Sequence, residues 1–187
     1  HGGCTVVTTI RVPSGRPSLV ADVADDIVVD IIDFEAPEPS ADPVGEARRA
    51  LEQPLGDFSW RDAPSVAIAV NDKTRPVPHE QLLPPLLERL AASGVPDDAI
   101  TFYVAVGGHA PMVASEFPDI LPPEVIDRYR VVSHDARADD LVALGETSRG
   151  TPILVNPGYA GADLKIVVGT IEPHQFAGYS GGVKSAA

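Results

Sequence analysis

Residues 65–78, SVAIAVNDKTRPVP, join a strand-like run to a polar loop, and this junction is the main indication of the fold class. Residues 65–71 form a continuous apolar run of the kind typical of a strand buried on both faces. After the loop, leucines recur at helical spacing, at Leu82, Leu83, Leu86, Leu87 and Leu90. Gly94 then offers an end for the helix. A strand, a loop and a helix in this order predict a βαβ unit.

The same alternation of strand-like and helix-like segments continues along the chain. Further strands are predicted at residues 100–106, 130–133, 151–155 and 164–171, and short helices at residues 42–51 and 122–129. Near the amino terminus, residues 4–12 and 27–32 predict two strands that could pair as a ribbon. We therefore expect a single α/β domain over residues 1–187, with a Rossmann-like, mostly parallel sheet, flanking helices and an amino-terminal β ribbon.

Composition and charge narrow the classes of function. With 187 residues, 44% of them apolar, the chain can bury a substantial core. Its formal net charge of −13 argues against nucleic acid or an anionic membrane as a partner, because both bind basic surfaces. The single cysteine, Cys4, excludes an intrachain disulfide and a CxxC metal motif. With no bilayer-length apolar run and no visible signal peptide, these features indicate a cytoplasmic protein.

Three predicted strands are each followed at once by a concentrated polar or glycine-rich loop. The loops are NDKTRPVP from Asn71, GGHAP from Gly107 and EPHQFAGYSGGVK from Glu172. Parallel strands place such loops at one edge of the sheet, where ligands bind in open α/β folds. That edge would carry six candidate residues, Asp72, Thr74, Arg75, His109, His174 and Lys184.

Each candidate also has a structural interpretation. Asp72 could cap the following helix and pair with Arg75, and His109 could belong to an ordinary turn. His79 and His134 are weaker candidates, because the first lies in the first turn of the leucine helix and the second at a strand end. The joint appearance of three such loops at one edge nevertheless favours a binding site.

The closing loop, EPHQFAGYSGGVKS, is not a phosphate-binding P-loop, because Val183 stands where that motif requires glycine. Gly178, Gly181 and Gly182 would let the backbone approach a ligand closely or adopt positive φ. The structural interpretation is a loose terminal tail with a solvated lysine.

Four motifs in this order, NDKTRPVP, VGGHAP, VVSHDA and EPHQFAGYSGGVKS, resemble the amino-terminal domain of the nickel-dependent lactate racemase family. The resemblance extends from about Ser65 to the end of the chain. It implies a nickel pincer nucleotide, a pyridinium mononucleotide whose sulfur-bearing arms hold nickel, attached covalently to Lys184. It also implies that the catalytic acid and base are His109 and His174. The remaining residues implied to bind the cofactor are Asp72, Lys73, Thr74, Arg75, Gly181 and Gly182, and Arg75 would also bind the substrate.

These residue types suit the racemisation of a 2-hydroxy acid by hydride transfer. Two histidines on opposite sides of the substrate can exchange the roles of base and acid between the enantiomers. An arginine offers a planar clamp for the carboxylate. The chain has no compact cluster of metal ligands, so no protein residue is assigned to the metal, and nickel would be held mainly through the cofactor.

The chain also departs from the family pattern. A further histidine beyond the lysine loop and a substrate-binding lysine in a carboxy-terminal domain are expected in the family and absent here, so we expect the isolated chain to be inactive. The alternative is a non-catalytic domain that binds a nucleotide-like ligand or docks on a partner. An ordinary NAD-binding domain is disfavoured, because no GxGxxG motif opens a helix after a strand.

Overall fold

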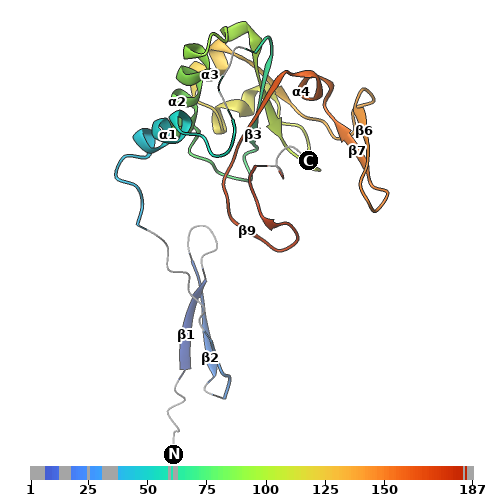
Figure 1. The fold of residues 1–187 in the computed structure, drawn as a ribbon. Coiled ribbons are helices and arrows are strands. Elements are labelled where there is room, and N and C mark those ends of the chain that lie inside the picture. Colours follow the sequence, from blue (N-terminus) through green and yellow to red (C-terminus); the bar gives the residue numbers. More distant parts are fainter. Residues whose placement is uncertain are drawn as a thin grey trace, which may run out of the picture. The chain divides into compact units, whose positions relative to one another are not determined.

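A computed structural model describes residues 7–12, 18–24, 26–30, 38–58, 60, 63–182 and 184 of the 187-residue chain. The chain divides into two compact units, His1–Pro39 and Ser40–Ala187. Each unit is described by itself below (Figure 1).

The amino-terminal unit contains an antiparallel hairpin, which confirms the predicted ribbon. Its strands are β1, Val7–Val12, and β2, Leu19–Ala24, with Val12 opposite Leu19. The predicted second strand at residues 27–32 was wrong, because residues 27–30 are not in a strand, and residues 31 and 32 lie outside the described part. The strand that pairs with β1 is β2, which begins earlier, at Leu19. Of the predicted first strand, residues 4–6 are also outside the described part.

The second unit is built on four parallel strands, which confirms the predicted Rossmann-like α/β fold. In spatial order they are β5, β4, β3 and β8. Their bounds are Arg130–Ser133 for β5, Ile100–Ala105 for β4, Val66–Asn71 for β3 and Leu164–Val168 for β8. Every residue of β3 is buried, as expected for a central strand covered on both faces.

One face of this sheet packs against three helices, which Figure 1 shows together on one side of β3. They are α1, Pro43–Glu52, α2, His79–Ala92, and α3, Pro123–Arg128. Fully buried side chains of this core include Ile68 of β3, Phe102 of β4 and Leu83 and Leu90 of α2. Gly94 adopts φ of 89° just after α2, which confirms it as the end of the leucine helix.

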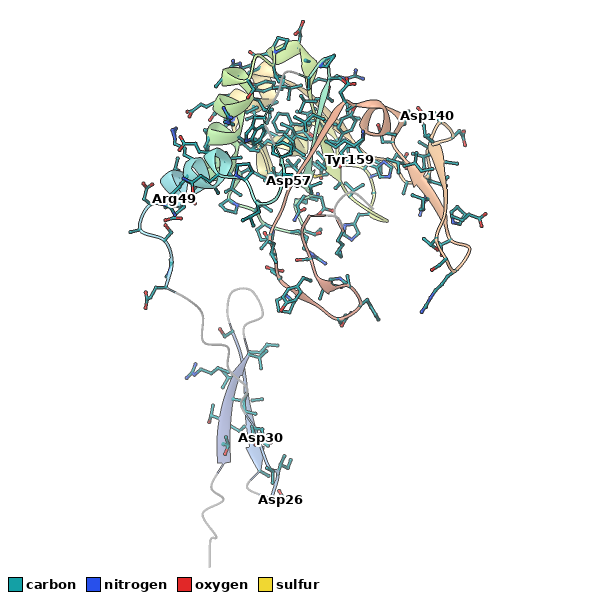
Figure 2. All side chains as sticks on the ribbon, in the orientation of Figure 1. Asp26, Asp30, Arg49, Asp57, Asp140 and Tyr159 are labelled. Carbon is teal, nitrogen blue, oxygen red and sulfur yellow. The ribbon has the colours of Figure 1, made fainter. Side chains whose placement is uncertain are left out.

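The other face of the sheet carries smaller residues and a short helix. Ala67 and Ala69 of β3 pack here with Tyr159 of α4, Pro157–Gly161, and Tyr159 is labelled in Figure 2. A separate antiparallel hairpin, β6, Val142–Glu146, and β7, Pro152–Val155, precedes α4. The predicted strand at residues 151–155 therefore exists, but it pairs with β6 and does not join the parallel sheet.

The order of the strands creates a crevice at one edge of the sheet. From β3 the chain moves outward to β4 and then β5, and it later returns to pair β8 with the opposite side of β3. The loops that follow β3 and β8 consequently diverge on either side of a topological switch point, which is where ligands bind in folds of this kind. After β8 comes a small hairpin of β9, Pro173–His174, and β10, Gly178–Tyr179. Two 3₁₀ helices complete the described elements, η1 at Asp97–Ala99 and η2 at Ala114–Asp119.

Candidate active site

A cavity of about 500 Å³ opens at this edge of the sheet and gathers residues from all three predicted loops. Its lining includes six of the predicted site residues, Asp72, Thr74, Arg75, His109, Gly181 and Lys184. His174, Lys73 and Gly182 do not line it. The loops were expected to meet because their strands are parallel neighbours, and the pairing of β3 with β4 and β8 supplies the physical reason.

The loop after β3 turns sharply at Asp72, whose carboxylate closes the turn. Oδ1 of Asp72 accepts hydrogen bonds from the backbone N of Thr74 at 3.0 Å and from its Oγ1 at 2.6 Å. The backbone N of Arg75 donates to the carbonyl of Asp72 at 3.1 Å. Aspartate commonly stabilises turns by bonding to backbone two residues on. The turn leaves Asp72 buried and Arg75 exposed at the cavity.

The loop after β4 brings His109 against this carboxylate. Gly107 adopts φ of 56°, a conformation that favours glycine, and the backbone N of His109 donates to the carbonyl of Val106 at 3.0 Å. Nδ1 of His109 then lies 2.7 Å from Oδ2 of Asp72. The two glycines before His109 thus form the turn that joins the second loop to the first.

The charge of Asp72 settles which group donates in this pair. Burial acts to raise the pKa of the Asp72 carboxyl, but hydrogen bonds from His109 and Thr74 outweigh it and hold the pKa below its ordinary value. Asp72 is therefore an ionised acceptor at neutral pH, and Nδ1 of His109 must carry the proton of the hydrogen bond. The lone pair of the uncharged ring is left on Nε2, where it can act as a base.

The loop after β8 is held by hydrogen bonds within itself and to the loop after β3. The hydroxyl of Thr170 donates to the carbonyl of Pro76 at 2.9 Å, which joins the two loops across the switch point. The hydroxyl of Ser180 donates to the carbonyl of Thr170 at 2.9 Å, and the backbone N of Ser180 to that of Glu172 at 2.8 Å. These bonds close the base of the β9–β10 hairpin. Glu172 and Ser180, at its two ends, both line the cavity.

Gly181 and Lys184 follow this hairpin at the wall of the cavity. A β carbon on Gly181 would lie 2.8 Å from the carbonyl oxygen of Thr170, and its φ is 78°, so a larger residue would strain the loop. The backbone N of Lys184 donates to the carbonyl of Gly181 at 3.2 Å, and this turn places Lys184 at the cavity. The close approach of Gly181 to the chain before the hairpin is therefore what positions the lysine.

His174 lies within the β9–β10 hairpin, outside the cavity lining. Its Nδ1 accepts hydrogen bonds from the backbone N of Phe176 at 3.2 Å and of Ala177 at 3.1 Å. Because backbone N–H groups can donate but not accept, the ring nitrogen that faces them must hold its lone pair. In the uncharged ring the proton of His174 is then on Nε2.

Lys73 and His79 border a different, smaller hollow of about 220 Å³. Lys73 forms an ion pair with Glu116, which also accepts a hydrogen bond from the backbone N of Val113. His79 is buried, and its Nδ1 lies 2.6 Å from the carbonyl oxygen of Ile120. This contact attaches the start of α2 to the segment after η2.

Two tyrosines and an asparagine line the cavity but were not predicted from the sequence as site residues. Tyr103 of β4 and Tyr159 of α4 line one wall, with ring centroids 5.8 Å apart in an edge-to-face arrangement. Burial raises the pKa of the Tyr103 phenol against the opposing charge of Arg130, so the hydroxyl stays protonated at neutral pH. Asn156 also lines the cavity, and its side-chain oxygen caps α4 through the backbone N of Gly158 at 3.0 Å. Its Asn-Pro-Gly sequence was the available signal, since asparagine before proline and glycine marks a capped helix start.

His134, a weak candidate in the sequence, also lines the cavity. Its backbone N donates to the carbonyl of Val104 at 3.1 Å, and its Nδ1 is buried without a hydrogen-bond partner among the described residues. In that same part of the chain, no three histidine, cysteine or carboxylate side chains gather as a metal site. None of the helices described is long and apolar enough to cross a membrane.

Comparison with known proteins shows which family this chain resembles. Residues 15–187 match the family described as the lactate racemase N-terminal domain. A lactate racemase from Thermoanaerobacterium thermosaccharolyticum is 29% identical over 186 residues, which cover 96% of this chain and 43% of that protein. A lactate racemase from Lactiplantibacillus plantarum is 35% identical over 142 residues, which cover 73% of this chain and 33% of that protein.

A solved structure agrees with the sequence comparisons. The lactate racemase apoprotein from T. thermosaccharolyticum matches with a TM-score of 0.77 and 28% sequence identity, over 95% of this chain and 42% of that chain. This chain therefore spans less than half the length of the relatives it matches. The match covers the whole parallel sheet and its three loops, and the chain belongs to the lactate racemase N-terminal domain family.

Proposed function

We propose that this chain is the amino-terminal catalytic domain of a nickel-dependent racemase or epimerase of 2-hydroxy acids, acting on lactate-like substrates in the cytoplasm. The observation that carries the proposal is the cavity that gathers the Asp72–His109 pair, Arg75 and Lys184, in a chain of this family. The rest of the active site would come from a carboxy-terminal domain, since the relatives are more than twice as long as their matched part. We accordingly expect the isolated chain to be inactive.

Proton transfer is assigned to the histidines. His109 offers the lone pair of Nε2, so it can take the hydroxyl proton of one enantiomer as the C–O bond becomes a carbonyl and the α-hydrogen leaves with its electron pair. His174, whose uncharged ring carries its proton on Nε2, can donate a hydrogen bond to the substrate oxygen and is the candidate for the opposite side of the substrate. It lies on a hairpin whose two ends, Glu172 and Ser180, line the cavity.

The carboxylate of the substrate is assigned to Arg75. This side chain lines the cavity and is exposed there, and one of its N–H groups donates to the carbonyl of Thr74 at 3.0 Å. The guanidinium carries further donors in a planar fork that matches a carboxylate. Lys73 is a poor alternative, because it pairs with Glu116 outside the large cavity.

The described residues fit a nickel pincer nucleotide. The cavity volume of about 500 Å³ falls within the range of about 300–1,000 Å³ that is usual for small-molecule sites. Gly108 lines it, and a β carbon there would meet nothing within 4 Å, so the backbone is open to a phosphate or ribose. Lys184 would hold the nucleotide covalently, and Arg75 and backbone amides would offset its negative charge. When bound, the nucleotide would supply an electron-poor ring that accepts the hydride and returns it.

The direct test uses the whole protein purified with its cofactor. Pure D and L enantiomers of a panel of 2-hydroxy acids are incubated separately, and their optical purity is followed by chiral chromatography. We expect at least one acid to lose optical purity from both starting enantiomers. Unchanged purity across the panel would overturn the proposal.

Lys184 can be tested separately from turnover by intact-protein mass spectrometry. We expect a covalent adduct on the whole protein that Lys184→Ala removes. Lys165→Ala is the matched control, because Lys165 lies on β8, donates to the carbonyl of Ala162 at 2.5 Å and does not line the cavity. Reversible ligand binding without an adduct or turnover would instead support a non-catalytic ligand-binding domain.

A further inference from the structure

The two candidate catalytic histidines use the same ring atom, Nδ1, in opposite ways. Nδ1 of His109 faces a carboxylate, whereas Nδ1 of His174 faces two backbone N–H groups. We propose that the chain itself fixes these rings in opposite tautomers, with the proton of His109 on Nδ1 and that of His174 on Nε2. In this proposal Asp72 is a positioning residue that acts through His109.

The contacts of Asp72 show why it suits this role. Its side chain is 6% exposed, Oδ1 is occupied by the N and Oγ1 of Thr74, and Oδ2 lies 2.7 Å from His109. The imidazole of His109 is 56% exposed, so packing alone does not hold its orientation. The hydrogen bond to a buried, immobile carboxylate does, and it also selects the tautomer, because a carboxylate can only accept.

The contacts of His174 produce the reverse arrangement. The amides of Phe176 and Ala177 belong to the tight connection between β9 and β10, and both direct their hydrogens at Nδ1. An uncharged ring that accepts at Nδ1 carries its proton at Nε2. The turn of the hairpin therefore sets the tautomer of the histidine from which it starts.

Opposite tautomers have a catalytic consequence, which rests on the proposed function. At Nε2, His109 presents a lone pair and His174 presents a proton before any substrate arrives. When His109 takes the hydroxyl proton it becomes an imidazolium that can return this proton, whereas the uncharged His174 can donate a hydrogen bond from Nε2 to the substrate oxygen. The two Nδ1 contacts would prepare one ring as a base and the other as a hydrogen-bond donor, without requiring either ring to be charged before the reaction.

The tautomers can be read directly by long-range ¹H–¹⁵N NMR spectroscopy of the whole protein without cofactor, with ring-¹⁵N histidine, at about pH 8.5. This pH lies above the range in which imidazoles ordinarily titrate. His109→Gln and His174→Gln identify the two spin systems. We expect a protonated Nδ1 for His109 and a protonated Nε2 for His174. A protonated Nε2 on His109, or a protonated Nδ1 on His174, would overturn the proposal.

Asp72→Asn tests the positioning role with little change in shape. The backbone N–H of Thr74 can only donate, so the oxygen of the new side-chain amide should remain opposite it. The NH₂ group then faces His109 and donates to Nδ1. We expect the proton of His109 to move to Nε2. In the loaded whole protein, kcat should fall about 10²- to 10⁴-fold with a much smaller change in KM.

Asp97→Asn is the matched control. Asp97 accepts hydrogen bonds from Arg128 and Tyr129, and it does not line the cavity. We expect this variant to leave the His109 tautomer and kcat unchanged. An Asp72→Asn protein that keeps the proton on Nδ1, or keeps full kcat after the tautomer has changed, would overturn the positioning role. A protein with the expected tautomers that racemises no hydroxy acid would overturn the proposed function and leave the tautomer assignment intact.

Discussion

Gly158, the second residue of α4, should not accept a side chain without loss of stability, because a tyrosine packs on it. A β carbon at Gly158 would lie 2.2 Å from the hydroxyl oxygen of Tyr103 and 3.2 Å from Cζ. Ordinary contacts begin at 3.4 Å, so Tyr103 would have to retreat by about 1 Å. Its ring already contacts that of Tyr159, which limits the retreat. Gly158→Ala should therefore strain the aromatic wall of the cavity.

The size of the effect is best measured against a glycine in the same helix. Overpacking of this kind costs about 1–3 kcal/mol, whereas alanine gains about 0.5–1 kcal/mol over glycine from helix propensity. At Gly161 a β carbon would meet nothing within 4 Å, so Gly161→Ala keeps the gain without the strain. We expect Gly158→Ala to be less stable than Gly161→Ala by about 1–3 kcal/mol.

Urea unfolding followed by circular dichroism gives the free energies of unfolding. A ligand-binding measurement shows whether the aromatic wall of the cavity is disturbed. Adding Tyr103→Phe to Gly158→Ala removes the clashing oxygen and should restore much of the lost stability. Equal stabilities for Gly158→Ala and Gly161→Ala, or no restoration by Tyr103→Phe, would show that Tyr103 does not restrict this position.

Three further predictions concern the core and the response to pH. Phe102→Ala should lower the free energy of unfolding by about 3–5 kcal/mol in urea, because Phe102 is fully buried, whereas Phe176→Ala, 87% exposed, should change it by under about 0.5 kcal/mol. Burial lowers the pKa of His79 below its ordinary 6.5, against the hydrogen bond to Ile120. As the pH falls, the unfolded chain therefore takes up the proton first, and the stability of the folded protein should fall below pH 6.5. His79→Leu should remove this dependence on pH, measured as unfolding midpoints between about pH 5 and 8. The pKa of Asp72 in the folded protein lies below its ordinary 3.8. Its contribution to the free energy of unfolding is therefore complete above pH 3.8 and is lost as the pH falls through the folded-state pKa. Asp72→Asn should reduce this loss of stability at acid pH, measured as unfolding midpoints in the same way.

The parallel sheet and the position of the site could be predicted because both depend on local patterns. A continuous apolar run followed at once by polar residues marks β3 and Asp72, and the same pattern marks β4 and the turn of His109. Parallel pairing then brings the loops together without further information.

The missed features depend on contacts that a local pattern does not show. Strand β2 was missed because the longer apolar run at residues 27–32 looks more strand-like than LVADVA, which Asp22 interrupts. Strand β6 is exposed along its whole length and contains a bulge between Ala143 and Gly145, so it lacks the signal of burial. Tyr103 alternates with buried Phe102 in β4, but which face would border a cavity depends on α4, a helix of five residues.

The pairing of β3 with β8 also constrains the order in which the protein can fold. Ser65 and Asp163, hydrogen-bonded at the start of these two strands, are 98 residues apart in the chain. During synthesis, the apolar strand β3 therefore has an unpaired edge until almost the entire described chain has emerged from the ribosome. Contacts of such long sequence separation form slowly. The strand that brings Lys184 to the cavity is thus the same strand that removes an aggregation-prone edge, so mutations that weaken β8 should reduce the yield of folded protein in the cell as well as its activity.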